Sequence, residues 1–278
     1  MPALIQGTVI LHPLVIILPL DDLEGNGRAS RCRSGVRLGV TTAGRSLVEY
    51  RIHAQTGKPR GQDEPVTPPS AAHGSILLVR HGQTAYSAAG RHTGLVDVPL
   101  NADGERQARA LGPIVGTQEV VGVWCSPLLR ARQTAELAGL ADLELDAQLQ
   151  EWDYGGYDGL TSAQISELLG RPYSLWRDGV VPGDTPGETL GQVRARCDEV
   201  IGRLLPRVLQ GDRRVLVAHG HQLRVLATSW LELPPEQAAF LALGPASLSV
   251  LAFEDDQRVI LAWNAGPNQP AVSPPSRS

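Results

Sequence analysis

An arginine and a histidine stand side by side where an apolar run ends. The run 76–79 is typical of a buried strand, and Arg80, His81 and Gly82 follow it directly. In open α/β sheets, ligands bind beyond the carboxyl ends of the strands. At such an edge a guanidinium can hold a phosphate or carboxylate through two hydrogen bonds, and an imidazole can attack it or carry a proton. The same residues also fit an ordinary strand-ending turn, so their meaning depends on what accompanies them.

Two further predicted strands end in similar groups. Arg130 falls in the first turn of a helix after the strand 122–125, and His219 follows the strand 213–218. If these strands are parallel neighbours, their end groups converge on one edge of the sheet. A helix opened by Ser126 as N-cap would add its N-terminal amides, which favour an anion. Two arginines, two imidazoles and a helix terminus suit a phosphoryl group, with one imidazole attacking phosphorus in line.

Phosphoryl transfer also needs an acid that protonates the departing alkoxide. Glu151 is the candidate, since it precedes two aromatic residues, Trp152 and Tyr154, that would shield its carboxyl group from water. We therefore predict that Glu151 joins the arginines and histidines at the same edge.

Strands and amphipathic helices must alternate to position these groups, and from residue 75 onward the sequence does alternate in this way. We predict an α/β fold, a three-layer sandwich with a mostly parallel central sheet and helices on both faces. The predicted strands cover residues 76–79, 122–125, 143–146 and 213–218, with a hairpin of 247–253 and 258–263 at one edge. The predicted helices cover residues 102–115, 126–138, 161–169 and 189–209, and a last one ends at residue 230. Thr185 and Glu188 have the spacing of a capping box ahead of the fourth helix.

Four ordered motifs carry a family resemblance. They are Arg80-His81-Gly82-Gln83-Thr84, the segment 126–134 (SPLLRARQT), the segment 151–155 (EWDYG), and Ala218-His219-Gly220. Over about residues 75–265 the chain resembles the histidine phosphatase superfamily, the phosphoglycerate mutase-like fold. The segments 90–94 and 151–161 are similar to a small-molecule acid phosphatase branch found in actinobacteria and to the yeast sedoheptulose-bisphosphatase type.

The resemblance implies roles for the residues already singled out. His81 would be the nucleophile that becomes phosphorylated, and Glu151 would act first as acid and then as base for water. Arg80, Arg130 and His219 would surround the phosphate, and we count His219 with His81 and Glu151 as catalytic. The resemblance implies no metal, and we expect no cofactor.

Three more residues are expected to contact the phosphate. Ser87 stands where many members carry asparagine, and its shorter side chain reaches less far. Thr93 lies on the loop after the nucleophile and fits either a substrate contact or an ordinary loop role. Gly220 follows His219 directly.

Alternative activities remain open on sequence grounds. The leading hypothesis is hydrolysis of a small phosphorylated metabolite, and the runner-up is a cofactor-dependent phosphoglycerate mutase. Between residues 160 and 187 the chain has Arg171, Arg177 and Tyr173 but no adjacent arginine pair, which favours hydrolysis. Two other hypotheses are a metallohydrolase using His81, His219 and His221, and a phosphate-binding module without catalysis.

Composition limits the class of partner. The 278 residues carry a net charge of −4, so nothing favours nucleic acid or an anionic membrane as a partner. The three cysteines are far apart in the chain, which suits a reducing cytoplasm. We expect a small phosphorylated substrate as the partner, and we keep a homodimer open.

The two ends of the chain differ from the part between them. Residues 1–73 show no sustained period, and we predict an N-terminal extension that is disordered or results from a start assigned too early. A basic arm that touches a partner is the alternative. The apolar stretch 3–20 contains prolines and lacks a preceding basic residue, which disfavours a signal peptide or membrane span. We predict a phosphatase domain at 74–265 and a disordered Pro- and Ser-rich tail at 266–278.

Overall fold

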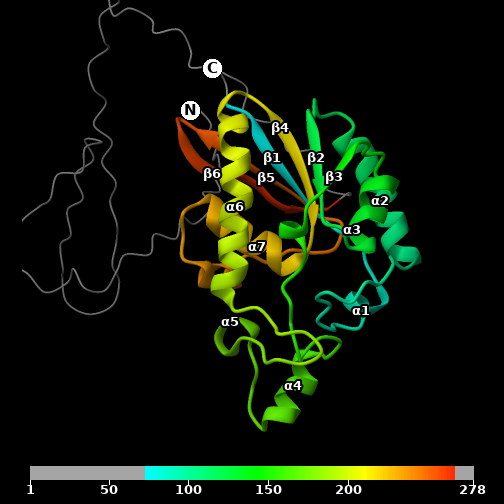
Figure 1. The fold of residues 1–278 in the computed structure, drawn as a ribbon. Helices are drawn as coiled ribbons and strands as arrows, with labels where there is room; N and C mark the ends of the chain where they lie inside the picture. Colours follow the sequence, from blue (N-terminus) through cyan, green and yellow to red (C-terminus); the bar gives the residue numbers. More distant parts are fainter. Residues whose placement is uncertain (1–72, 267–278) are drawn as a thin grey trace, which may run out of the picture. The chain divides into compact units, whose positions relative to one another are not determined.

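A six-stranded sheet lies at the centre of the computed structural model, which describes residues 73–266 (Figure 1). The strand order is β3-β2-β4-β1-β5-β6. The strands are β1 (Ser75–Arg80), β2 (Gly122–Cys125), β3 (Leu143–Leu145), β4 (Arg213–Ala218), β5 (Leu248–Glu254) and β6 (Gln257–Ala265). The first four pair in parallel, while β5 runs antiparallel to β1 and to β6. The predicted mostly parallel sheet with an edge hairpin is confirmed.

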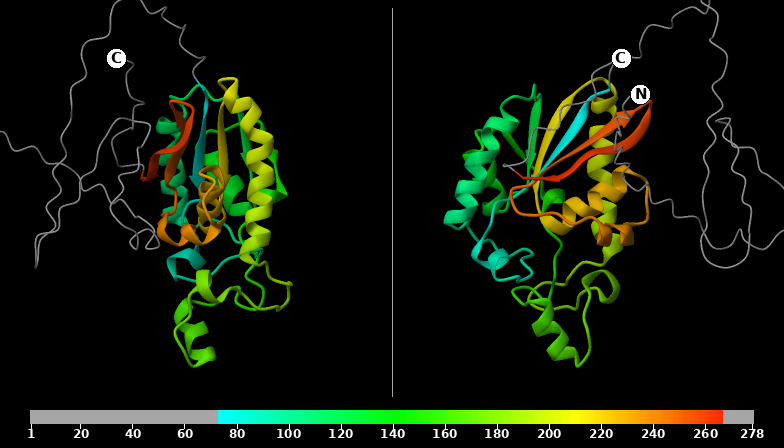
Figure 2. Two further views of the ribbon diagram at one scale, coloured as in Figure 1. Left: turned by 90° about the vertical axis from the view of Figure 1, so that its left-hand side faces the viewer. Right: turned by 180° about the vertical axis from the view of Figure 1, so that it is seen from behind.

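Helices cover both faces of this sheet. Helices α6 (Leu190–Leu209) and α7 (Gly220–Trp230) lie on one face, and α2 (Ala102–Val115) and α3 (Leu129–Leu137) lie on the other (Figure 2). Because side chains alternate along a strand, β1 serves both layers. Its even-numbered apolar residues belong to the core under α6 and α7, and its odd-numbered ones to the core under α2 and α3. The predicted three-layer sandwich is therefore confirmed.

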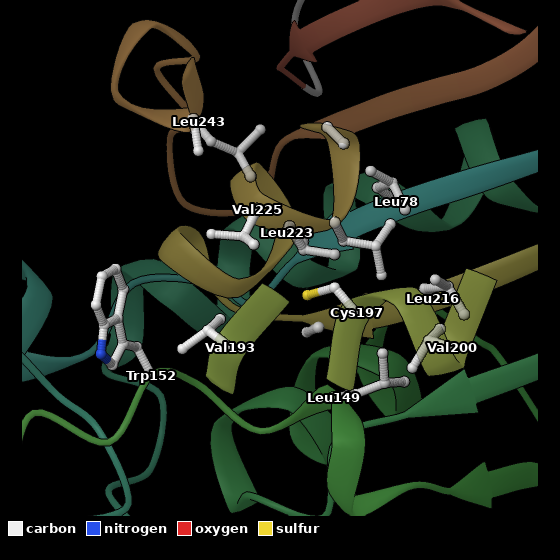
Figure 3. Packing of buried hydrophobic residues seen from close by; sticks show 14 of the residues in the cluster. Leu78, Leu149, Trp152, Val193, Cys197, Val200, Leu216, Leu223, Val225 and Leu243 are labelled. Atoms are coloured by element: carbon white, nitrogen blue, oxygen red, sulfur yellow. The ribbon is translucent and has the colours of Figure 1, made fainter. Parts of the chain in front are cut away.

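The larger core lies between the sheet and the pair α6 and α7. Figure 3 shows Leu78 and Leu216 of the sheet near Cys197 and Val200 of α6 and Leu223 of α7. Cys197 is fully buried there, and burial raises the pKa of its thiol to about 12. This cysteine is therefore a small apolar packing residue, as its position in an amphipathic helix suggests.

Short elements and long loops lie beyond the carboxyl ends of the parallel strands. They comprise α1 (Ala85–Ala88), η2 (Ala147–Leu149), α4 (Ser162–Leu169), α5 (Leu175–Asp178) and η3 (Pro235–Phe240). In Figure 1, α1, α4 and α5 gather at the lower end of the sheet. None of the helices between residues 73 and 266 is both long and apolar enough to cross a membrane.

One predicted helix start and one predicted capping box are wrong. Helix α3 begins at Leu129 rather than at Ser126, with Leu128 as N-cap and no capping side chain. The amide of Leu129 donates to the Asp97 carboxylate at 2.6 Å, so a carboxylate of the chain itself already uses this predicted anion site. The serine hydroxyl instead serves a long-range contact described below.

The wrong capping box concerns α6, whose predicted start at residue 189 agrees with the structure. Its capping box is formed by Thr189 and Gln192, while the Thr185 hydroxyl donates to Asp153 and the Glu188 carboxylate pairs with Arg196. The predicted extension at 1–73 and the predicted tail at 266–278 lie outside the described residues except for residues 73 and 266.

Candidate active site

The register of two parallel strands brings two histidines together. Arg80 at the end of β1 pairs with Ala218 at the end of β4, so His81 and His219 are the next residues on neighbouring strands. Their ring centroids lie 5.1 Å apart. Both side chains are buried. The convergence expected from the strand ends is therefore present in the fold.

One nitrogen of His81 is fixed by its own backbone. Nδ1 lies 2.7 Å from the Gly82 carbonyl oxygen, which can only accept, so Nδ1 carries the hydrogen and donates it. Burial, followed by the positive charges of Arg130 and Arg80, holds the pKa of His81 well below its ordinary value of 6.5. The ring is therefore neutral near pH 7, with an unprotonated Nε2 available as a nucleophile.

The Arg80 guanidinium lies next to this histidine with an unsatisfied donor. Its Nη1 donates to the Leu243 carbonyl, whereas its Nε is buried and has no hydrogen-bond partner among residues 73–266. A Cβ at Gly220 would lie 3.1 Å from Cζ and Nε of Arg80, so glycine lets the helix approach the guanidinium face. A buried N–H without an acceptor costs free energy, which an anion at this place would recover.

Arg130 and His219 lie behind His81. The Arg130 Nε donates to His219 Nδ1 at 3.2 Å, and the His219 Nε2–H therefore donates to Ser126 Oγ at 2.7 Å. This serine directly follows β2, whose last residue, Cys125, pairs with Val217 on β4. Burial and the Arg130 charge hold the pKa of His219 well below 6.5.

The remaining donors of Arg130 hold a loop. Nη1 donates to the Val96 carbonyl at 2.9 Å, and Nη2 donates to the carbonyls of Thr93 and Gly94 at 3.1 and 2.8 Å. Its side chain is fully buried. Arg130 thereby joins the segment 93–96, which follows the predicted nucleophile, to the His219 ring.

Glu151 meets the start of α7. Its Oε1 accepts from the amides of Trp152 at 3.0 Å and Gln222 at 2.8 Å, and its Oε2 accepts from the amide of His221 at 3.1 Å. The positive end of the helix dipole also favours a carboxylate here. Oε1 has two donors and Oε2 has one, so Oε2 retains more capacity to exchange a proton. Tyr154 lies alongside, and its hydroxyl group is hydrogen-bonded to His221 Nδ1.

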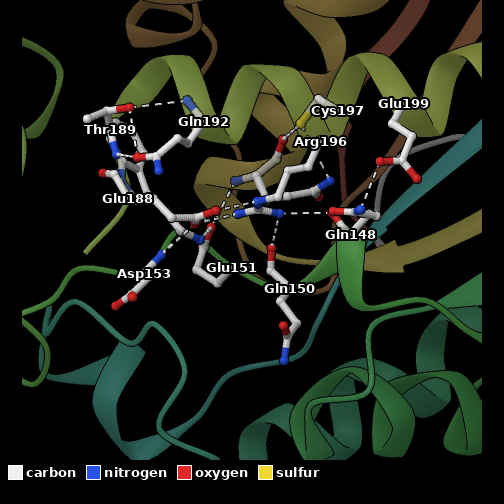
Figure 4. A network of polar contacts seen from close by, with 12 residues as sticks. Gln148, Gln150, Glu151, Asp153, Glu188, Thr189, Gln192, Arg196, Cys197 and Glu199 are labelled. Carbon is white, nitrogen blue, oxygen red and sulfur yellow. Dashed lines mark hydrogen bonds and ion pairs between the residues drawn. The ribbon is translucent and has the colours of Figure 1, made fainter. Parts of the chain in front are cut away.

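A polar network fixes the segment that carries Glu151 (Figure 4). Arg196 of α6 donates to the carbonyls of Gln148 and Gln150, at 2.8 and 2.6 Å, and to both carboxylate oxygens of Glu188. Glu188 in turn accepts from the Asp153 amide at 2.9 Å. The chain is thus held just before and just after Glu151.

A cavity of about 200 Å³ opens among these groups. Six of the eight predicted site residues line it, namely Arg80, His81, Ser87, Thr93, Glu151 and Gly220. The other two, Arg130 and His219, are not among its lining residues. The cavity also exposes residues outside that predicted set, namely Gly90, Arg91, His92, Tyr154, His221, Arg224 and Leu243.

Sequence reasoning missed Arg224. A signal was available, because Arg224 lies four residues after Gly220 and hence on the same face of the predicted helix. His221, which the sequence offers as a candidate metal ligand, also lies at the cavity. Burial, with the nearby charge of Arg224, holds the pKa of His221 well below 6.5.

The two hydroxyl residues of the predicted set already have local partners. Ser87 Oγ accepts from the Thr84 amide at 2.9 Å and donates to the Thr84 carbonyl at 3.2 Å, within a capping box of α1. Thr93 Oγ1 donates to the Arg91 carbonyl at 3.3 Å. Either hydroxyl must rotate before it can donate to a phosphate.

The arrangement does not match the metallohydrolase alternative. Within residues 73–266, no group of three or more His, Cys, Asp or Glu side chains is placed so that it could hold a metal ion. This includes His81, His219 and His221, although the first two are in ring contact. Their other contacts, to the Gly82 carbonyl and to Arg130, suit neutral imidazoles within a cationic site.

Fold and site thus define an α/β sandwich with a buried histidine–arginine centre at the carboxyl ends of its parallel strands. A sequence model of the histidine phosphatase superfamily (branch 1) matches residues 76–266, and the chain belongs to this superfamily. The resemblance stated from the motifs is confirmed.

Three individual proteins of known class are similar to this chain. The chain is 39% identical over 185 residues to an acid phosphatase of Mycobacterium tuberculosis, covering 66% of this chain and 88% of that relative. It is 36% identical over 186 residues to a sedoheptulose 1,7-bisphosphatase of Saccharomyces cerevisiae, covering 56% and 67%. Among solved structures, a mycobacterial glucosyl-3-phosphoglycerate phosphatase in complex with VO3 matches with a TM-score of 0.61 and 30% identity, covering 69% of this chain and 99% of the other.

Proposed function

We propose that this protein is a phosphomonoesterase that hydrolyses a small phosphorylated metabolite through a phosphohistidine at His81. One observation carries the proposal: the unpartnered, buried Nε of Arg80 lies beside a histidine whose Nδ1 is fixed and whose Nε2 is free. The relatives named above support hydrolysis of phosphate esters as the reaction class. A volume of about 200 Å³ lies below the roughly 300–1,000 Å³ of most ligand pockets, which favours a small substrate.

The first step is attack of His81 Nε2 on phosphorus. A nitrogen–phosphorus bond forms while the bond from phosphorus to the ester oxygen breaks, and the electron pair of that bond goes to the leaving oxygen. Glu151, protonated on Oε2, gives its proton to this oxygen, and an alcohol leaves. The Arg80 guanidinium neutralises charge on the transferred phosphoryl group.

The second step returns the enzyme to its starting state. The Glu151 carboxylate takes a proton from a water molecule as that water attacks phosphorus. The nitrogen–phosphorus bond breaks, its electron pair returns to Nε2, and inorganic phosphate leaves. The amides that hold Glu151 keep the same carboxyl group in place for both proton transfers.

Arg130 adds positive charge next to this centre, and His219 adds a ring N–H donor. Burial and neighbouring charges favour a neutral His219 ring, and the Arg130 guanidinium keeps that ring oriented toward Ser126. Direct contact of either side chain with the phosphate stays a prediction. The absence of a metal requirement, a cytoplasmic location and a homodimer also stay predictions.

Replacement of His81 tests the proposal. His81→Ala should lower hydrolysis of para-nitrophenyl phosphate by about 10³-fold or more, because a nucleophile that forms a covalent intermediate has no substitute. The matched control is His73→Ala, which removes a half-buried histidine that is paired with Asp256 and lies outside the cavity lining. Activity of His81→Ala comparable to the control would refute the proposal.

The same preparation separates the alternatives. With 3-phosphoglycerate and a 2,3-bisphosphoglycerate primer, we expect release of inorganic phosphate without accumulation of 2-phosphoglycerate. Accumulation of 2-phosphoglycerate would identify a mutase. Activity should persist after treatment with a chelator, and its loss would restore the metal hypothesis.

A further inference from the structure

Two arginines at the cavity have no role in the reaction described above. Arg91 lies on the loop after α1, and Arg224 lies on α7, so two separate segments bring guanidinium groups to one opening. Neither side chain forms an ion pair with another residue in the range 73–266. The question is what these charges recognise.

Helix geometry places Arg224 at a definite distance from the phosphate end. Gly220 faces the Arg80 guanidinium, and Arg224 lies on the same helix face one turn later. Four residues of α-helix rise by about 6 Å. Arg80 and Arg224 therefore lie at opposite ends of one short stretch of the cavity wall. A ligand held by both must carry two recognisable groups a few atoms apart.

Arg224 is held in position before any ligand arrives. Its Nε donates to the Ala238 carbonyl and its Nη2 to the Ala239 carbonyl, each at 2.9 Å. Its Cζ lies 4.5 Å from the ring centroid of Trp176, which packs on the guanidinium face. Within residues 73–266 no acceptor pairs with its Nη1. A planar, oriented guanidinium with free N–H groups is suited to a carboxylate or phosphate.

Arg91 is more loosely held. Its side chain is exposed, and its Cζ lies 5.5 Å from the ring centroid of Tyr86. Its backbone is anchored by a bridge to Thr161 and by an amide hydrogen bond to the Tyr86 carbonyl. The base of the side chain is therefore fixed while the charged end can reach across the cavity mouth.

The charges around the cavity leave an excess of positive charge. Its lining within residues 73–266 contains three arginines and one carboxylate, that of Glu151. This carboxylate already accepts three amide hydrogen bonds. Burial holds the pKa values of the lining residues His81, His92 and His221 below 6.5. These three rings are therefore neutral near pH 7, and the positive charge of the cavity comes from its arginines.

We propose that Arg91 and Arg224 form a second anion subsite, which selects phosphate esters that carry a carboxylate or second phosphate a few atoms from the scissile phosphoryl group. This inference rests on the proposed function, since it describes the substrate of the same cavity. It makes Arg91 and Arg224 specificity-determining residues that act at the far end of the substrate.

Matched substrate pairs test the subsite. Glycerol 3-phosphate and 3-phosphoglycerate differ by a carboxylate, and fructose 6-phosphate and fructose 1,6-bisphosphate differ by a phosphate. We would measure kcat/KM for each from released inorganic phosphate, using the wild type, Arg91→Gln, Arg224→Gln and the control Arg109→Gln. Arg109 is an exposed arginine of α2 that lies outside the cavity lining.

In at least one pair, the wild type should favour the ester with the second anionic group by about tenfold. This corresponds to about 1.4 kcal/mol from a charge-assisted hydrogen bond. The pair that shows the preference identifies the anion as carboxylate or phosphate. Arg91→Gln and Arg224→Gln should each reduce the ratio toward one, and Arg109→Gln should retain it. Because Arg91 is exposed, its variant remains informative if replacement of Arg224 disturbs α7.

Ratios near one in both pairs, or ratios unchanged in both cavity variants, would overturn the subsite. If the wild type hydrolyses both members of each pair with equal kcat/KM, the subsite fails and the proposed phosphatase stands. If it hydrolyses neither these four esters nor para-nitrophenyl phosphate, the proposed function fails, and the subsite fails with it.

Discussion

Arg196 and Glu188 form a two-point ion pair that brackets the segment carrying Glu151. The Arg196 Nε and Nη2 donate to the two Glu188 oxygens at 2.9 and 3.0 Å. The guanidinium also holds the Gln150 carbonyl, and the carboxylate holds the Asp153 amide. This pair therefore connects α6 to the backbone on both sides of the proposed acid.

Breaking this pair should affect catalysis as well as stability. Arg196→Met leaves a largely buried carboxylate without its partner, and we expect a loss of about 3 kcal/mol in the free energy of unfolding. Displacement of Glu151 should also lower kcat by about tenfold, with little change in KM. Urea unfolding and steady-state kinetics measure the two effects, with the exposed Arg207→Met on the same helix as control. A folded Arg196→Met enzyme with unchanged kcat would show that Arg196 does not position Glu151.

Gly220→Ala should weaken phosphate binding. The added methyl group would lie 3.1 Å from Arg80 Nε and Cζ, so the guanidinium must shift by a few tenths of an ångström from its place at the cavity. We expect the inhibition constant of inorganic phosphate to rise about tenfold, equivalent to about one charge-assisted hydrogen bond. Gly202→Ala on α6 is the matched control, because its methyl group meets nothing within 4 Å. Equal inhibition of the two variants by phosphate would contradict the tight contact between Gly220 and Arg80.

Acidic pH should leave the nucleophile unprotonated. Burial and nearby arginines hold the pKa of His81 well below 6.5, whereas hydrogen bonding to Asp256 raises the pKa of His73. In a ring-carbon NMR titration toward acidic pH, His73 should become protonated above pH 6.5, and His81 should become protonated only at a lower pH. Protonation of His81 at or above the ordinary histidine pKa would contradict the burial described for it.

Stability should respond to the same depressed pKa values. Between the unfolded pKa near 6.5 and the lower folded pKa, the unfolded chain binds more protons than the folded one, so stability falls as the pH falls. Each such buried histidine contributes a slope of about 1.4 kcal/mol per pH unit in that window. Urea midpoints measured from pH 7 to 5 should therefore decline, and a flat profile would argue against neutral buried histidines.

Replacing Glu151 should discriminate between leaving groups. Glu151→Gln keeps the side-chain size but cannot donate the proton, so hydrolysis of an alkyl phosphate should fall by about 10²-fold or more. Hydrolysis of para-nitrophenyl phosphate should fall less in the first step, because its phenolate leaves without a proton. The comparison uses glycerol 3-phosphate and pre-steady-state release of para-nitrophenol. Equal losses for both substrates in that first step would exclude Glu151 as the acid.

The sequence was sufficient for the sheet and for the convergence of strand ends. Apolar runs end abruptly at Arg80 and His219. Because β1 and β4 are parallel neighbours, the residues that follow these two runs lie side by side. The contacts made by Ser126 and Glu188 were not predictable in the same way. Both residues have the local spacing of helix caps, yet Ser126 bonds His219 on a distant segment, and Glu188 bonds Arg196 of α6 and the Asp153 amide. Local propensity cannot reveal which partner wins such a competition.

The sequence also could not show which of the clustered side chains line the cavity and which lie buried behind it. Motif order groups Arg130 with Arg80, but only the folded chain distinguishes the arginine at the cavity from the one that holds the loop 93–96 behind it. Arg224 was recoverable from helix periodicity after Gly220, although no motif drew attention to it.

Trapping the phosphoryl group tests the central claim most directly. The wild-type enzyme would be mixed with substrate, quenched within milliseconds under alkaline conditions that preserve phosphohistidine, digested and sequenced by mass spectrometry. We predict one added phosphoryl group on His81, absent from His81→Ala and present at a higher level in Glu151→Gln if hydrolysis of the intermediate is slowed more than its formation. Burst-phase turnover with the phosphoryl group on another residue, or on none, would contradict the account.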